Sequence, residues 1–257
     1  MKNKLNNELA VCGFSAVKTL EKTNSDRIKR LYFTEDRAPL FGGLCKTLSK
    51  RKAPYNKVKD PSELERLCGS VHHQGVVAMI EAPEVLHLNT DIVEEWITTG
   101  QNALLLDRVG NANNLGAIVR SAAFFGIRNI VIPENEAQSS ITTSSYRVAE
   151  GGMEFVNIYS IRSIPSLLQA VEGRMMRIGT DLKAKTDVSK LHSICGQKPA
   201  IIILGTEEKG ISDEVRRNCD ALVIIPFSGM TAGKASPVES LNVAQAASII
   251  LYELSKK

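Results

Sequence analysis

The carboxyl-terminal part of the chain carries a series of short, nearly uninterrupted apolar runs, and this pattern limits the possible folds most strongly. The runs are "ALLLD" at residues 103–107, "NIVIP" at 129–133, "MRIGT" at 176–180, "AIIILG" at 200–205 and "ALVIIP" at 221–226. A strand with one solvated face alternates apolar and polar residues, whereas a strand covered on both faces does not. Helix-like segments follow several of these runs, from about Leu115, near 144–152 and from Ser240. We therefore expect an α/β fold with a mostly parallel sheet flanked by helices.

The amino-terminal part predicts a smaller α/β unit. Its expected strands are "RLYFT", "PYNKVK" and "GVVAMIE", and its expected helices run through "GGLCKTLSKR" and from "DPSELERLCG". Asp60, Pro61 and Glu63 form a typical helix start, because they supply a cap, a proline at the first helical position and an acid in the first turn. The apolar patterning breaks at Pro83, and a short helix-like stretch around Trp96 leads to the next apolar run. We expect a domain at 1–85, a linker at 86–100 and a second domain at 101–257.

Composition excludes several classes of protein. The 257 residues are 43% hydrophobic and 23% charged, which is ordinary for a globular chain. No apolar run approaches the roughly 20 residues that span a bilayer, and the start lacks the apolar stretch of a secretory signal. We therefore expect a cytoplasmic protein without membrane contacts. The five cysteines are odd in number and scattered, so we expect neither a disulfide framework nor a metal site.

The positive charge of the chain is concentrated at its amino-terminal end. Residues 1–85 hold 15 Lys and Arg against 10 Asp and Glu, whereas residues 86–257 hold 17 against 18. The densest stretch is "KTLSKRK" at 46–52. Clustered cations attract the phosphates of nucleic acids, but a solvated helix face has the same composition, and the sequence leaves both interpretations open.

A lone cation interrupts the stretch "NANNLGAIVRSAAFFG" at 111–126, where Arg120 is the only charged residue between Arg108 and Arg128. At about 100° per residue, Arg120 lies off the apolar stripe of the expected helix. Helical side chains lean toward the amino end, so its guanidinium should lie over Gly116, near Asn114. A helix amino terminus with amides and a cation is typical of an anion site for a phosphate. An ordinary solvated arginine is the alternative.

Two further turns follow buried runs. In "ILGTEEKGIS" at 203–212, Glu207 lies between Gly205 and Gly210, and the glycines would allow a close approach of the backbone. The other is the loop at 227–239, which precedes the expected helix from Ser240. For the turn at Glu207 the alternative is a simple turn with surface acids, whereas long ordered loops inside compact domains tend to be functional. The spacing of "GMTAGKAS" differs from that of a phosphate loop and no GxGxxG occurs, which excludes a nucleoside triphosphatase and a dinucleotide enzyme.

Together the three turns resemble the three signature motifs of the SpoU/TrmH family, the RNA ribose 2′-O-methyltransferases of the SPOUT class. The matching residues are Asn114, Gly116 and Arg120 in the first motif, Gly205, Glu207 and Gly210 in the second, and Ile225, Pro226, Ser240, Leu241 and Asn242 in the third. In addition, "HHQGVVA" at 72–78 resembles the end of the substrate-binding domain of this family. The resemblance covers nearly the whole chain. The loop at 227–239 is longer than the family pattern.

The resemblance implies a SPOUT-type sheet with a carboxyl-terminal trefoil knot and a small ribosomal-protein-like α/β domain that binds RNA. It also implies S-adenosylmethionine (S-adenosyl-L-methionine) as cofactor and a homodimer with composite active sites. The positions implied for the cofactor are Thr180, Gly205, Gly210, Ile225 and Leu241. Those implied for catalysis and substrate orientation are Asn114, Arg120, Glu207, Ser240 and Asn242.

The expected reaction is therefore methyl transfer to a ribose 2′-hydroxyl of rRNA or tRNA. Arginine rarely loses its proton, so we expect Arg120 to clamp a phosphate and the developing oxyanion, although the role of base stays open. Two alternatives remain. The chain could be a non-catalytic RNA-binding or assembly factor that kept the fold, or it could methylate a base. The sequence does not identify the RNA or the nucleotide.

Overall fold

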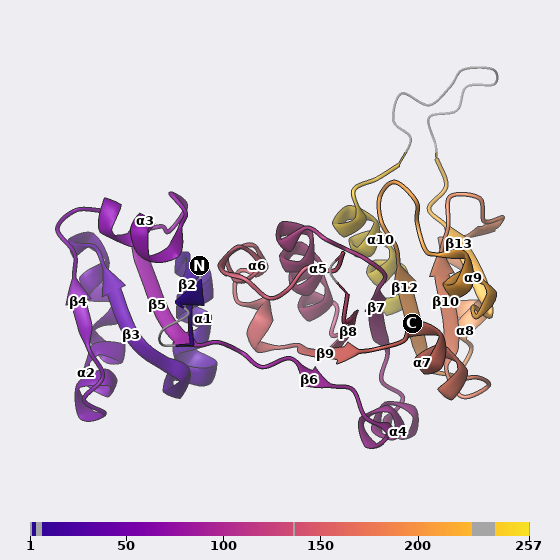
Figure 1. The fold of residues 1–257 in the computed structure, drawn as a ribbon, viewed down its shortest axis with the longest axis horizontal. Helices are drawn as coiled ribbons and strands as arrows, with labels where there is room; N and C mark the ends of the chain where they lie inside the picture. Colours follow the sequence, from indigo (N-terminus) through magenta and orange to yellow (C-terminus); the bar gives the residue numbers. More distant parts are fainter. Residues whose placement is uncertain (1, 4–6, 136, 228–239, 257) are drawn as a thin grey trace. The chain divides into compact units, whose positions relative to one another are not determined.

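The computed structural model describes residues 2–3, 7–135, 137–227 and 240–256, and the chain divides into two compact units (Figure 1). Unit 1 comprises Met1–Glu84 together with Ser140–Phe155, and unit 2 comprises Val85–Ser139 together with Val156–Lys257. The first boundary lies next to the expected one. However, residues 86–100, expected as a linker, belong to unit 2, and Ser140–Phe155, expected in the second domain, belongs to unit 1.

Unit 1 is built on a five-stranded mixed sheet in the order β1-β2-β5-β3-β4. Its strands are β1 (Lys2–Asn3), β2 (Glu8–Cys12), β3 (Ile28–Phe33), β4 (Tyr55–Lys57) and β5 (Val76–Glu81). Its α-helices are α1 (Phe14–Asn24), α2 (Gly42–Lys50), α3 (Ser62–Cys68) and α6 (Thr143–Ala149). The three central strands β2, β5 and β3 pair antiparallel, and β3 and β4 pair parallel. The strands and helices that the sequence predicted here are present, whereas β2 and α1 were not predicted.

The start of α3 matches its sequence pattern to within one residue. The Asp60 carboxylate accepts hydrogen bonds from the backbone amide of Ser62 at 2.9 Å and from its hydroxyl at 2.6 Å. Pro61 occupies the cap position, so the helix begins at Ser62 rather than at Pro61. The first turn contains Glu63, whose carboxylate accepts from the Asp60 amide at 3.4 Å.

Unit 2 contains an eight-stranded sheet in the order β11-β13-β10-β12-β7-β8-β9-β6, and its neighbouring strands pair parallel. The strands are β6 (Leu86–His87), β7 (Ala103–Leu106), β8 (Asn129–Pro133), β9 (Asn157–Ile161), β10 (Met176–Thr180), β11 (Thr186–Asp187), β12 (Ala200–Leu204) and β13 (Ala221–Ile224). The α-helices are α4 (Thr90–Thr99), α5 (Ala112–Phe124), α7 (Ile164–Ala170), α8 (Leu191–Cys195), α9 (Asp213–Arg217) and α10 (Val243–Ser255). The predicted parallel sheet is confirmed.

The apolar runs are buried on both faces of this sheet. Leu104 and Leu105 of β7 point to opposite faces, and neither is exposed to solvent. One face packs against α4, α7 and α9, whose side chains share a core cluster with Leu105 and Ile203. Trp96 of α4 belongs to this cluster and is 2% exposed, so residues 86–100 contribute to the core of unit 2. Because both faces of the sheet are buried, its central strands need apolar residues at successive positions.

The last helix begins later than the sequence predicted. The expected start was Ser240, but α10 begins at Val243 and Asn242 is its cap, with a side chain that accepts from the Ala244 amide at 2.9 Å. Ser240 and Leu241 therefore precede the helix and belong to no helix or strand. The helix then packs along α5, and Figure 1 shows this pair of helices together (α10 in yellow). Within the described residues, no helix has the length and apolar character to cross a membrane.

Candidate functional site

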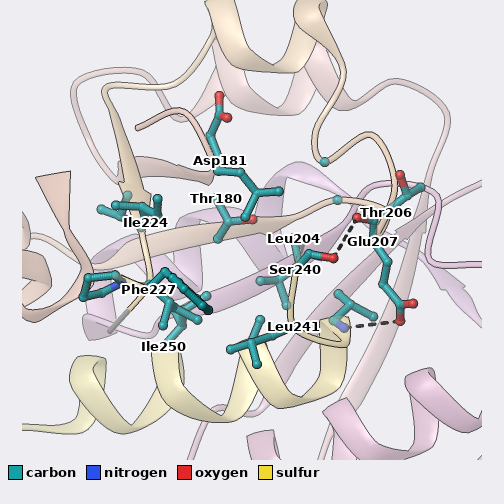
Figure 2. A pocket seen from close by; sticks show the side chains of 18 residues that line it. Thr180, Asp181, Leu204, Thr206, Glu207, Ile224, Phe227, Ser240, Leu241 and Ile250 are labelled. Atoms are coloured by element: carbon teal, nitrogen blue, oxygen red, sulfur yellow. Dashed lines mark hydrogen bonds between the residues drawn. The ribbon is translucent and has the colours of Figure 1, made fainter. Parts of the chain in front are cut away.

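A cavity of about 460 Å³ lies at the carboxyl ends of β10, β12 and β13, closed on one side by the start of α10 (Figure 2). All five positions predicted to bind a cofactor line it: Thr180, Gly205, Gly210, Ile225 and Leu241. Parallel strands place their carboxyl ends at one edge of a sheet, and ligands of open α/β sheets bind at that edge. The Thr180 hydroxyl donates to the carbonyl of Ile203 at 3.1 Å, which ties two of the strand ends together.

The turn after β12 is held closed by its own backbone. Thr206 and Gly210 exchange two backbone hydrogen bonds, of 3.1 and 2.8 Å, and Gly210 has a positive φ of 62°. A Cβ atom on Gly205 would lie 2.0 Å from the carbonyl carbon of Gly210, so only glycine fits at this position. Both predicted glycines therefore have a steric reason in this turn.

An ion pair that the sequence did not single out supports the same turn. The buried carboxylate of Asp107, directly after β7, accepts from Arg108 Nε at 2.8 Å and from the Ser212 amide at 2.9 Å. Arg108 Nη2 also donates to the carbonyl of Gly210, at 3.3 Å. The hydrogen bond with Asp107 raises the pKa of the Arg108 guanidinium, although burial opposes this shift. In the sequence, the position of Asp107 at a strand end could have identified it as a site residue, whereas no sequence feature pointed to its partner Arg108.

Glu207 is the centre of a hydrogen-bonded group that joins all three motifs. Its Oε1 accepts from Asn242 Nδ2 at 2.7 Å, from Asn114 Nδ2 at 2.9 Å and from the Val243 amide at 3.3 Å. Asn242 Nδ2 also donates to Asn114 Oδ1 at 3.0 Å, and the Ser240 hydroxyl donates to the Glu207 carbonyl at 3.4 Å. Four of the five predicted catalytic residues therefore meet in one place.

A second cavity, of about 410 Å³, lies on the other side of this group. Asn111, Asn114, Arg108 and Lys209 line it, and so do both acids of the turn. Glu207, Thr206 and Val243 line both cavities. The hydrogen-bonded group around Glu207 therefore separates a mainly apolar space from a polar one.

Arg120, the remaining predicted catalytic residue, lies within α5. Its side chain lies on the exposed face of α5, and it is absent from the described residues that line the two cavities. In contrast, the neighbouring Gly116 and Val119 are buried. Angle counting therefore correctly placed Arg120 off the apolar stripe of the helix.

The sequence analysis missed several residues that line the first cavity, among them three that follow strands. Asp181 and Leu182 follow β10, and Phe227 follows β13. Asp181 forms an ion pair with Arg216 and thereby connects the cavity wall to α9. Their place directly after buried strands was the one signal that could have found them. The long loop at 227–239, noted as a departure from the family pattern, lies outside the described residues from 228 onward.

The geometry of the two cavities suits a small-molecule ligand beside a polar acceptor. Drug-sized ligands occupy cavities of about 300–1,000 Å³ with mostly apolar walls and few polar groups. The first cavity has this size and is walled by residues such as Val223, Ile224 and Ile250. The amides and the carboxylate at its border can orient a hydroxyl group that approaches from the second cavity.

Comparison with known proteins assigns both parts of the chain. The model of the SpoU rRNA Methylase family matches residues 101–252, and a model described as RNA 2′-O ribose methyltransferase substrate binding matches residues 10–86. An uncharacterized tRNA/rRNA methyltransferase of Mycobacterium avium (strain 104) is 33% identical over 199 residues, which are 76% of this chain and 60% of that protein. The chain thus spans about 60% of the length of the curated relatives it matches.

Solved structures share the fold. The SpoU methyltransferase AviRb from Streptomyces viridochromogenes, in complex with the cofactor AdoMet, has a TM-score of 0.75 at 24% identity and is matched over 99% of this chain and 93% of its own. An AdoMet-bound rRNA methyltransferase from Sinorhizobium meliloti has a TM-score of 0.71 at 20% identity, over 96% of this chain and 86% of its own. At these identities the likeness establishes a mixed α/β fold with a mostly parallel sheet.

Proposed function

This chain belongs to the SpoU rRNA methylase family, and from that membership we propose that it transfers a methyl group from S-adenosylmethionine to a ribose 2′-hydroxyl of rRNA or tRNA. The observation that carries the proposal is the hydrogen-bonded group around Glu207, because it draws residues of all three motifs to the border between two cavities. The matched substrate-binding model and the names of the relatives support an RNA substrate.

The first cavity is the proposed cofactor site. Its walls combine apolar side chains with the backbone of the turn at Gly205 and Gly210, and AdoMet is bound in two related structures of this fold. Thr180, Ile225 and Leu241 would complete the contacts. When bound, S-adenosylmethionine supplies an electrophilic methyl group on its sulfonium.

The second cavity is the proposed entrance for the ribose. Its polar lining suits a nucleotide, and Asn114 faces both this cavity and Glu207. Glu207 holds the side-chain amides of Asn114 and Asn242 in fixed orientations, so that they can position the attacking hydroxyl. Ser240 fixes the turn through the Glu207 carbonyl.

Arg120 is proposed to act in the site of a partner subunit within a homodimer. The Arg120 side chain is exposed on α5 and does not line the cavities of its own chain among the described residues. Large apolar side chains exposed on the packed helices α5 and α10 support a covered face: Phe124 is 82% exposed and Tyr252 is 53% exposed. There the guanidinium would clamp a phosphate of the RNA and the developing oxyanion, because an arginine is a poor base.

The finer architecture is part of the same proposal. We propose that the chain forms a trefoil knot near its carboxyl end, supported by the sheet order, in which β13 lies two strands beyond β12 while α10 returns to pack on α5. We also propose that unit 1 is the RNA-binding domain with a ribosomal-protein-like fold, supported by the match of residues 10–86.

The decisive experiment is methylation of total RNA from cells lacking the protein, with labelled S-adenosylmethionine. Ribose methylation protects the neighbouring phosphodiester bond, so label is expected in alkali-resistant dinucleotides. We expect Arg120→Ala to lower the rate by about 10²–10³-fold, the range seen when an oxyanion contact is removed. Cofactor binding, measured by calorimetry, should stay unchanged. Arg128→Ala, an exposed arginine just beyond α5, is the matched control.

Other outcomes separate the alternatives. Label in mononucleotides after alkali would indicate base methylation. Absence of S-adenosylmethionine binding by the wild-type protein would indicate an RNA-binding factor that kept the fold. If Arg120→Lys kept near-normal turnover, the proposed bidentate contact of the Arg120 guanidinium with the phosphate and the oxyanion would be wrong.

A further inference from the structure

Two buried cysteines lie next to each other in unit 1, away from the proposed site. Cys12 is the last residue of β2 and Cys68 is the last residue of α3. Their exposed fractions are 0% and 3%, and both belong to one apolar cluster with Leu64, Val77 and Met79. Because the helix packs on the strand at this point, the two thiols come together from positions far apart in the sequence.

The two thiols are hydrogen-bonded to each other. The Cys12 thiol donates to the Cys68 sulfur, and this bond lowers the pKa of the Cys68 thiol to about 7 while it raises the pKa of Cys12. The Cys68 thiol also donates to the carbonyl of Ser70, at 3.3 Å. A thiolate is the reactive form of cysteine, so Cys68 is the nucleophile of this pair and Cys12 the proton donor beside it.

The other three cysteines have different surroundings. Burial raises the pKa of Cys45, Cys195 and Cys219, so their thiols remain protonated at neutral pH. Cys68 also lies at the end of an element. It ends a helix of seven residues, and Gly69 follows in the left-handed conformation before the exposed Val71. Local opening of this last turn would admit a small oxidant.

We propose that Cys12 and Cys68 are a redox site, in which a peroxide converts the two thiols reversibly into a disulfide that ties α3 to β2. In the first step the Cys68 thiolate attacks a peroxide oxygen and the O–O bond breaks, which gives a sulfenic acid, and the departing hydroxide takes up the proton that Cys68 released and forms water. In the second step the Cys12 sulfur attacks the Cys68 sulfur. The S–S bond forms, the S–O bond breaks, and the departing hydroxide takes the proton of Cys12 as a second water. Two thiols are oxidised and one peroxide is reduced.

The disulfide would fix the part of unit 1 that leads into β5. It would close a loop that spans β3, α2 and β4, and it would hold the end of α3 against the central sheet. A cross-link of this length restricts the unfolded chain, so the oxidised form should be more resistant to unfolding. Both cysteines lie within the residues matched as substrate binding. The proposal nevertheless does not depend on methyl transfer.

The test uses the full chain, reduced, freed of reductant and treated with hydrogen peroxide. Free thiols, counted after denaturation, should fall from five to three. Peptide mass spectrometry should find the Cys12 and Cys68 peptides joined, with the loss of two hydrogen atoms. Dithiothreitol should restore all five thiols, and the reaction rate should rise with pH through neutrality. Cys45→Ser is the control in the same unit and should lose the same two thiols.

Two single variants test the proposal separately, so that it can still be refuted if one of the two cysteines is needed for folding. In Cys12→Ala, the sulfenic acid has no partner, so dimedone should label Cys68. In Cys68→Ala, dimedone should not label Cys12, because burial still raises the pKa of the Cys12 thiol and slows its oxidation to a sulfenic acid. If peroxide leaves five free thiols in the wild-type chain, or joins other cysteines instead, the redox site does not exist.

Discussion

Two carboxylates, Glu154 in unit 1 and Glu207 in unit 2, each collect several hydrogen-bond donors, but their surroundings differ. The Glu154 side chain is 1% exposed and accepts from Asn24 Nδ2 at 2.6 Å and from Arg27 Nη1 at 3.0 Å. Arg27 in turn donates to the hydroxyl of the buried Tyr146, at 3.0 Å. Glu207 is exposed, and its donors are the amides of Asn114, Asn242 and Val243.

The difference separates a structural carboxylate from one available to a ligand. Buried charges require a counter-charge, and Arg27 provides it for Glu154, which anchors the segment Ser140–Phe155 to the end of α1. Glu207 lies between two cavities and organises neutral amides. Unit 1 is thus joined by an ion pair, whereas the site in unit 2 depends on a close backbone turn and oriented amides.

The largest effect is expected from Gly205→Ala. The added Cβ would lie 2.0 Å from the Gly210 carbonyl carbon, so the turn that forms the wall of the first cavity must move. We expect a loss of at least about 3 kcal/mol in cofactor binding or in stability, as for other backbone clashes. Calorimetry with S-adenosylmethionine would measure cofactor binding, and thermal unfolding would measure stability. Gly43→Ala is the control in unit 1, because its Cβ would meet nothing within 4 Å. Unchanged binding by Gly205→Ala would contradict the turn's role.

The next largest effect is expected from Glu207→Ala. Asn114 and Asn242 would lose their common acceptor, and such misplacement of substrate-orienting groups costs about 10²-fold in rate. The free energy of unfolding should fall by only about 1 kcal/mol, through the lost contact at the start of α10. Glu214→Ala, an exposed acid on α9, should leave both quantities unchanged. A large loss of stability would place Glu207 in the same class as Glu154.

Glu154→Gln should give the reverse result. The Arg27 guanidinium would remain partly buried without its counter-charge, so we expect unit 1 to lose about 2 kcal/mol of stability, less than for a fully buried pair because Arg27 is 30% exposed. Hydrogen exchange of α1 and α6 would report the loss. The methylation rate of the folded protein at saturating RNA should not change. If Glu154→Gln and Glu207→Ala lost the same stability and the same methylation rate, the distinction between the two carboxylates would be wrong.

The smallest effect concerns an ion pair of unit 2 that lies at the amino ends of β10 and β13. Asp220 accepts from Arg177 Nη2 at 2.6 Å and from Arg177 Nε at 3.0 Å, and these hydrogen bonds hold its pKa below the ordinary 3.8. A depressed pKa stabilises the folded state above the unfolded value, and this contribution is lost as the pH falls through the folded value. Asp220→Asn should therefore be less stable than wild type at pH 7, and the difference should shrink below about pH 4.

Urea unfolding between acid and neutral pH would measure this difference. A gap between wild type and Asp220→Asn that is independent of pH would mean that the pair contributes through packing alone. A confirmed acid dependence would show that structural ion pairs stabilise both units. Glu207, which binds neutral amides at the border of the cavities, would then differ from the structural carboxylates of both units.

The fold was predictable where one physical requirement controlled the residues. Apolar runs covered on both faces identified β7, β8, β10, β12 and β13, and the cap at Asp60 identified α3. The strand β9 was missed, because "NIYSI" mixes polar residues into its run. The helix α4 was taken for a linker, because the burial of Trp96 depends on side chains distant in the sequence.

The candidate site was predictable as a set of motifs but not as a geometry. Glycines and amides at strand ends identified the turns, and the resemblance related them to one another. The Asp107–Arg108 pair and the residues Asp181, Leu182 and Phe227 were missed, because their one signal, a place after a buried strand, does not distinguish them from other residues that follow strands. The assignments of Asn114, Arg120, Glu207, Ser240 and Asn242 to catalysis remain predictions.

By itself the sequence determined that the chain builds a parallel sheet and carries three polar turns after buried strands, because burial and local turn chemistry act over a few residues. The tertiary structure alone decided which turns meet. Asn114 and Asn242 share Glu207 because β7 and β12 are neighbours and α10 packs on α5. It also decided that Ser140–Phe155 joins unit 1, since the Arg27–Glu154 pair forms between residues more than a hundred positions apart. Contacts over such distances follow from the whole packed chain, which no local pattern encodes.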